Sequence, residues 1–115
     1  MSFSIRLSPE PVRSLAHTSI GAAYMGIGTA LDHKARIINI SNLTNGQLMI
    51  SFDGVHDHFP LVPAAFLHLD ICKNDLGPEL MSLEVGDRLY VKELNAVSAP
   101  NKGSVYLTVF YGKDE

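Results

Sequence analysis

The sequence predicts an all-β protein that folds as a single antiparallel β-sandwich with a jelly-roll-like arrangement. Short runs of alternating apolar and polar residues follow one another from residue 35 to residue 111, and each ends at Gly, Pro, Asn or Asp. In the run over residues 104–111, for example, Val105, Leu107 and Val109 fall on one face. This period of two is that of half-buried strands. Strands that recur about every ten residues without intervening helices are typical of sandwiches and jelly rolls.

The first 31 residues differ in character from the rest. Residues 3–7 alternate like a strand, and Pro9 and Pro11 end it because proline donates no ladder hydrogen bond. Residues 11–16 predict at most one helical turn. Residues 19–31 combine three glycines with small side chains, which favours an extended, closely packed segment, either an edge strand or an arm. We therefore expect an extended N-terminal segment or arm over residues 1–31 and the sandwich domain over residues 32–115.

Strands are expected after this segment at residues 35–40, 47–52, 64–72, 88–94 and 104–111. Asn45-Gly46 and Asp53-Gly54 are hairpin-turn signals, Pro60 interrupts a short run at residues 59–62, and residues 75–78 form a further break. The expected core residues are Ile38, Ile40, Leu48, Ile50, Phe52, Leu67, Leu69, Leu89, Val91, Val105, Leu107 and Val109.

Composition narrows the classes of function. The chain has 115 residues, 46% of them hydrophobic and 18% charged, against roughly 25% charged in an average soluble domain. This shortage of charge indicates that a partner covers part of the surface. The net charge of −3 argues against nucleic-acid binding. No run resembles a signal peptide or a membrane span, so we expect synthesis in the cytoplasm without export.

One cysteine, Cys72, leaves no intrachain disulfide framework, and we expect it to be a small apolar residue in or near the core. No Gly-x-Ser-x-Gly elbow is present, and the spacing of Gly21, Gly26 and Gly28 fits no phosphate-binding loop. The sequence therefore predicts no catalytic residue and no cofactor.

His56-Asp57-His58 is the one candidate for metal chemistry, with His68 as a third imidazole. A cupin places a His-x-His pair on a strand and follows it with a glutamate. Here residues 59–63 contain no carboxylate, and Asp53-Gly54 places the histidines in a turn. We therefore interpret the motif as a solvated hairpin loop without a metal. A small metal-dependent cupin-like enzyme using His56, His58 and His68 remains the alternative.

Several stretches together resemble small virion proteins of tailed bacteriophages: residues 38–44, 49–58, 63–70, 89–92 and 103–112. The resemblance covers roughly the final two-thirds of the chain and consists of strands and turns rather than catalytic residues. It implies a non-enzymatic structural protein of the virion, made in the host cytoplasm. It also implies a capsid decoration or cement protein, or a head–tail or tail component. Its partners would be other virion proteins.

The shortage of charge also predicts a homo-oligomer or a larger assembly. We expect Tyr24, Met25 and Ile27 to form the contact, because no obvious strand of the sandwich accommodates them. The alternative is that these three residues complete the sandwich core. A carbohydrate-binding attachment module is a further alternative for the function of the whole chain.

Overall fold

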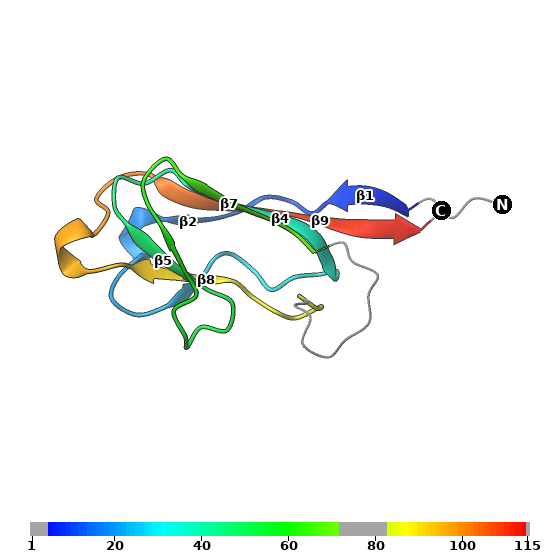
Figure 1. Cartoon of the computed structure of the whole chain (residues 1–115), viewed down its shortest axis with the longest axis horizontal. Coiled ribbons are helices and arrows are strands. Elements are labelled where there is room, and N and C mark those ends of the chain that lie inside the picture. The colour runs from blue at the N-terminus through cyan, green and yellow to red at the C-terminus, as the bar shows by residue number, and fades with distance from the viewer. Residues whose placement is uncertain (1–4, 72–82, 115) are drawn as a thin grey trace.

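Two antiparallel β-sheets form the protein in the computed structural model (Figure 1), which describes residues 5–71 and 83–114. The five-stranded sheet has the order β1-β9-β4-β7, with β2 also paired to β9, and the four-stranded sheet has the order β3-β8-β5-β6. The expected all-β fold of two packed sheets is confirmed. The jelly-roll connectivity stays a prediction. The strands are β1 (Ile5–Pro9), β2 (Arg13–Ala16), β3 (Met25–Gly26), β4 (Ala35–Asn42), β5 (Leu48–Ser51), β6 (Phe59–Leu61), β7 (Phe66–Asp70), β8 (Tyr90–Glu93) and β9 (Ser104–Asp114).

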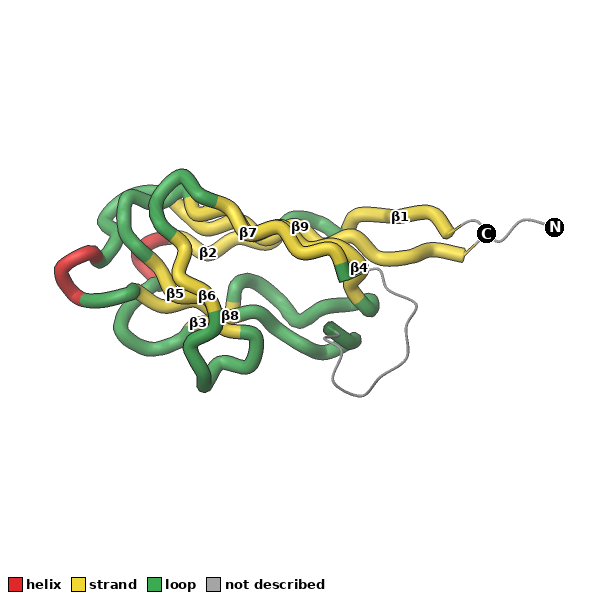
Figure 2. Tube along the Cα trace, viewed as in Figure 1, coloured by secondary structure: helices red, strands yellow, loops and turns green. Residues whose placement is uncertain are grey.

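Two short 3-10 turns, η1 (His17–Ser19) and η2 (Ala96–Ser98), are the helical elements among the described residues. Neither has the length or apolarity that a membrane-crossing helix would need. Figure 2 shows that loops make up much of the region around the four-stranded sheet.

Strands β4 and β9 form the centre of the five-stranded sheet. Ile38 pairs with Val109 and Ile40 with Leu107, and all four side chains lie in the core. Because directly opposite residues share a face, these pairs form the inner face of the sheet. Leu48 and Ile50 of β5 cover it from the other sheet, together with Val91 of β8. The period of two in the sequence thus marks the buried face of both sheets.

The expected core is largely confirmed, since all of its members are buried except Phe52 and Leu69, which are partly buried against it. The structure adds residues that strand alternation could not identify, because most of them lie in irregular segments. These are Ile20, Ile27, Leu31, Ala35, Leu61 and Leu83. Cys72 and the break expected at residues 75–78 lie outside the described residues.

The N-terminal part of the chain requires one correction, and its described residues belong to the two sheets. Residues 13–16, expected within a helical turn, form β2 and pair with β9 from Arg13↔Leu107 to Ala16↔Ser104. The described part of the expected arm is built into both sheets, because β1 and β2 pair with β9 and β3 pairs with β8. Pro9 and Pro11 divide the edge beside β9 into the two short strands β1 and β2. They do not prevent pairing with β9, since an edge strand forms ladder hydrogen bonds on one side only.

Asn42 joins the two sheets at one end of the sandwich. It is fully buried on β4, and its Nδ2 donates to the carbonyl oxygens of Gly46 (2.9 Å) and of Leu61 on β6 (2.8 Å). Its Oδ1 accepts from the amide (3.0 Å) and the hydroxyl (2.6 Å) of Thr44. A carboxamide has two donor hydrogens and two acceptor lone pairs, so the hydrogen-bonding capacity of Asn42 is fully used.

We predict that Asn42→Ala lowers the free energy of unfolding by about 3 kcal/mol, because it leaves several buried polar groups unpaired. Urea unfolding of the variant and the wild type measures this difference. Asn45→Ala is the matched control. Asn45 is exposed and bonds the exposed loop residue Asn101, so its loss is expected to cost less than about 1 kcal/mol. Equal effects of the two substitutions would contradict the role of Asn42 as the junction.

Candidate functional site

The outer face of the five-stranded sheet is the candidate site of interaction. We define it as the side chains at paired strand positions that point away from the four-stranded sheet. The pairs Ser41↔Phe66 and Ser41↔Tyr106 set one row across it, and Ile37↔Phe110 sets another. The described side chains of the outer face are Leu7, Pro9, Ser14, Ala16, Ile37, Asn39, Ser41, Phe66, His68, Asp70, Ser104, Tyr106, Thr108 and Phe110.

Large apolar side chains are exposed on the outer face. Phe66 exposes 64% of its surface, Leu7 46% and Tyr106 38%, while Ile37 and Phe110 are half-buried. Asp70 is the one charged residue among the described side chains defined above. Single exposed hydrophobic residues are ordinary, but aromatic and aliphatic groups collected on a face with a single charged residue are typical of protein–protein contact surfaces.

The sequence itself indicates this face, although the alternation of apolar and polar residues makes the indication hard to see. Residues 104–110 place Val105, Leu107 and Val109 inward, yet Tyr106 and Phe110 on the opposite face are also apolar. Apolar groups on both faces of a strand are typical of a sheet that is covered on both sides. Within the described part of the chain, the four-stranded sheet covers one of them.

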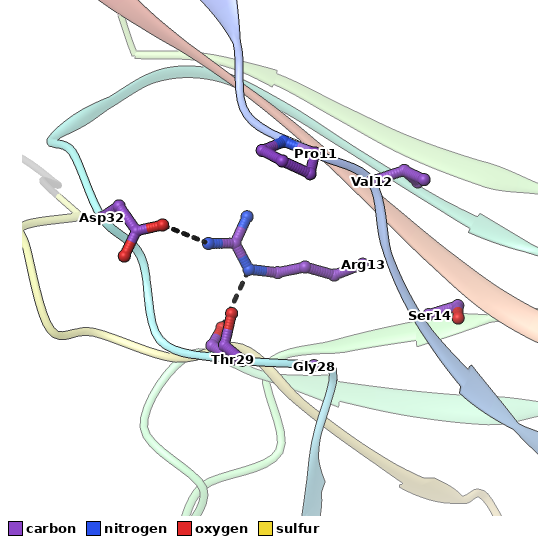
Figure 3. A pocket seen from close by; sticks show the side chains of 7 residues that line it. All are labelled: Pro11, Val12, Arg13, Ser14, Gly28, Thr29 and Asp32. Carbon is purple, nitrogen blue, oxygen red and sulfur yellow. Dashed lines mark hydrogen bonds and ion pairs between the residues drawn. The ribbon is translucent and has the colours of Figure 1, made fainter.

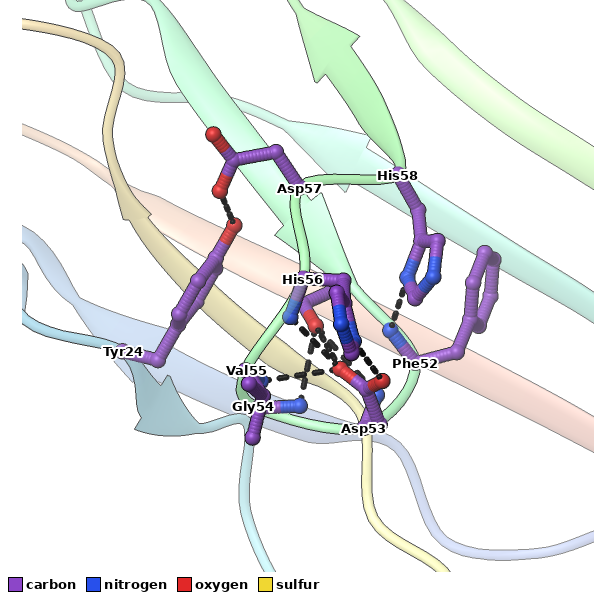
Figure 4. Close-up of polar contacts among 9 residues, drawn as sticks. Tyr24, Phe52, Asp53, Gly54, Val55, His56, Asp57 and His58 are labelled. Carbon is purple, nitrogen blue, oxygen red and sulfur yellow. Dashed lines mark hydrogen bonds and ion pairs between the residues drawn. The ribbon is translucent and has the colours of Figure 1, made fainter.

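The His56-Asp57-His58 motif forms a structured turn between β5 and β6 (Figure 4). Asp53 holds it, because its Oδ1 accepts from the backbone amides of Val55 (2.8 Å) and His56 (2.9 Å). Its Oδ2 accepts from His56 Nδ1 at 2.7 Å. These bonds, first of all those from His56, lower the pKa of Asp53. The carboxylate is thus committed to closing the turn.

The three histidines of the cupin-like alternative are not brought together. His58 Nδ1 accepts from the amide of Phe52 at 3.0 Å, which engages that ring nitrogen in the turn. His68 lies on β7, on the outer face of the other sheet, beside Asn39. Among residues 5–71 and 83–114, no three His, Cys, Asp or Glu side chains are arranged to hold a metal ion.

Tyr24 fastens this turn to the segment before β3. Its hydroxyl donates to Asp57, and Lys92 lies 3.4 Å from the same carboxylate and 4.8 Å from the centre of the Tyr24 ring. Burial, followed by the bond to Asp57, raises the pKa of Tyr24, and that bond lowers the pKa of Asp57. The arrangement keeps the phenol protonated and the carboxylate charged.

The three expected contact residues, Tyr24, Met25 and Ile27, therefore have different roles in the structure. Ile27 is fully buried in the core of this chain, so its expected role in an interface is wrong and the alternative, a core role, holds for it. Tyr24 makes the intramolecular contacts described above. Met25 on β3 exposes 45% of its surface, and its part in a contact stays a prediction.

A buried ionic cluster, which sequence analysis did not identify, closes the side of the sandwich near β2. The side chain of Glu10 is 2% exposed, and its oxygens lie 2.7 Å from Arg13 Nη2 and 2.8 Å from His33 Nδ1. Arg13 also donates to the carbonyl oxygens of Thr29 and Ala30, each at 2.9 Å. The cluster thereby links the beginning of β2 to residues 29–33.

An open pocket of about 290 Å³ lies beside Arg13, lined by residues 11–14, 28, 29 and 32 (Figure 3). Ligand pockets usually contain convergent polar groups that are available to the ligand. Here the guanidinium of Arg13 is shared between Glu10, the two carbonyl groups and, at 3.9 Å, Asp32. We therefore assign the cluster a structural role.

Comparisons with protein-family models, curated proteins and solved structures find no match for this chain.

We predict that Glu10→Gln lowers the free energy of unfolding by about 3 kcal/mol at neutral pH, because it leaves Arg13 buried without its carboxylate. Burial alone would raise the pKa of Glu10, but the bonds from His33 and Arg13 outweigh it and hold this pKa below its ordinary value of 4.5. The folded state thus binds fewer protons than the unfolded state.

The stabilisation by Glu10 is therefore complete above pH 4.5 and is lost as the pH falls through the pKa of the folded state. The difference in the free energy of unfolding between Glu10→Gln and the wild type, measured by urea unfolding, should become smaller as the pH falls below 4.5. Glu84→Gln is the control, because Glu84 is half-exposed and pairs with exposed Lys34 at 3.5 Å. A Glu10 effect that is independent of pH would contradict the assignment.

Proposed function

We propose that the protein is a non-enzymatic structural component of a tailed-bacteriophage particle, most specifically a capsid decoration or cement protein. A head–tail or tail component is the nearest variant. The observation that carries the proposal is the outer face of the five-stranded sheet, which presents Phe66, Tyr106 and Leu7 with hardly any charge.

The outer face suits docking on another protein. Apart from His68 and Asp70, its strand positions carry hydroxyl, amide and apolar side chains, and removing these from water costs less than removing charged groups. The side chains stand on a sheet whose other face is packed into the core, so little backbone conformational freedom is lost on binding. The outer face is therefore rigid, and its removal from water costs little free energy.

The resemblance of five stretches between residues 38 and 112 to small virion proteins supports the choice of a phage particle as the partner. A protein that occupies many equivalent positions on a symmetric shell needs a rigid fold and one binding surface. The two packed sheets and the outer face meet both requirements, and the His56-Asp57-His58 turn is occupied by its own hydrogen bonds.

Particle binding tests the proposal. Purified particles that lack the protein are mixed with it and separated on a density gradient, and the bound fraction is measured by mass spectrometry. We expect the wild type to sediment with the particles in a fixed ratio to the capsid or tail protein. A protein that stays at the top of the gradient would contradict the proposal.

We predict that Phe66→Lys and Tyr106→Lys each weaken particle binding at least about tenfold, because each places an unpaired charge in the contact. Val97→Lys is the matched control, since Val97 lies in η2, is 98% exposed and does not belong to the outer face. It adds the same charge and should bind like the wild type. Equal weakening by all three substitutions would indicate a general charge effect rather than a specific surface.

A further inference from the structure

The two sheets have four edges, and three of them are unsuited to accepting a further strand. The edge formed by β1 and β2 is interrupted by Pro9 and Pro11, β6 contains Pro60, and β3 is two residues long. Proline and short length are the usual protections against edge-to-edge pairing. Strand β7 differs: it has five residues, none of them Pro, Lys or Arg.

Among the described strands, β7 pairs with β4 alone. Two bonds beyond its ends fix which backbone groups face β4: the Asn42 amide donates to the Ala65 carbonyl (2.9 Å), and the Ile71 amide donates to the Arg36 carbonyl (2.7 Å). In an antiparallel pair, hydrogen-bonded and non-hydrogen-bonded positions alternate. The odd-numbered residues of β7 therefore bond to β4, and the backbone groups of Phe66 and His68 point to the edge that no described strand covers.

We propose that β7 pairs antiparallel with β7 of a second copy of this chain, about a two-fold axis that passes beside His68. In this register His68 faces His68 of the second copy, and the two residues exchange both backbone hydrogen bonds. Leu67 faces Leu69 of the second copy, and Phe66 faces Asp70. The two five-stranded sheets become one continuous sheet.

A second copy suits this edge better than an unrelated peptide for three reasons. An antiparallel edge is complementary to itself under two-fold symmetry. The register places the half-buried Leu69 against Leu67, so the apolar inner face continues across the junction. It also places no two carboxylates opposite each other, because Asp70 faces Phe66.

The pairing has a geometric consequence for the outer face. Directly opposite residues share a face, so His68 and its counterpart lie on the same side of the joined sheet. The outer faces of the two copies then form one surface of twice the area. This inference does not depend on the identity of the particle, and it can fail or succeed separately from the proposed function.

Disulfide trapping tests the register. In a Cys72→Ser background, His68→Cys is oxidised with diamide under native conditions. A hydrogen-bonded antiparallel pair has a Cα–Cα distance of about 5.5 Å, within the range of about 4.4–6.8 Å that disulfides span. We expect a covalent dimer on a non-reducing gel.

Phe66→Cys is the matched control, because it lies on the same strand and face and is well exposed. In the proposed register, position 66 of one copy lies four residues, roughly 13 Å, along the strand from position 66 of the other copy, so no disulfide should form. Equal trapping of both variants, or of Phe66→Cys alone, would overturn the proposal.

A proline substitution tests the backbone bonds. His68→Pro removes the outward amide, and position 68 faces away from β4, so folding is expected to survive. The dissociation constant of the dimer, measured by sedimentation equilibrium, should rise about thirtyfold, the change expected from the loss of two hydrogen bonds. His68→Gln keeps the amide and should dimerise like the wild type. A wild type that stays at 12.5 kDa at every concentration, or a folded His68→Pro that dimerises normally, would overturn the proposal.

Discussion

The buried carboxamide of Asn42 is the constraint on which the rest of the structure depends. One side chain on β4 reaches β6 of the other sheet and the turn that follows its own strand. The backbones around it approach so closely that side chains are excluded: a Cβ on Gly46 would lie 2.5 Å from the Ser98 carbonyl oxygen, and one on Gly103 would lie 2.1 Å from that of Leu43. The loops that precede β5 and β9 are therefore positioned by the same junction.

Alternation in the sequence predicted the central strands because their inner face is buried and regular. Ile38 and Ile40, paired with Val109 and Leu107, are members of that pattern. Ile27 could not be recognised in the same way, since it enters the core from an irregular segment, where no period exists to identify it. Strand β2 was mistaken for a helical turn because Pro11 suits the first turn of a helix as well as the edge of a sheet.

The candidate site was predicted less well than the fold, for a physical reason. Histidines and carboxylates attract attention as chemical groups, but in this chain they mainly hold local structure: Asp53 closes a turn and Glu10 fastens β2 to a neighbouring segment. The candidate interaction surface is made of residues such as Tyr106 and Phe66, whose type alone does not tell a core from a contact. The three-dimensional arrangement was needed to separate these two roles.

Strand β9 has a consequence for how the chain acquires its structure. Its residues, Ser104–Asp114, pair with β1, β2 and β4, which all precede it by many residues in the sequence. During translation these earlier strands leave the ribosome without their shared neighbour, so the five-stranded sheet cannot assemble until β9 has emerged. Topologies dominated by such distant pairings fold slowly. The newly made chain thus passes through a period in which the apolar residues of β4 are unprotected, and this is when it is most exposed to aggregation.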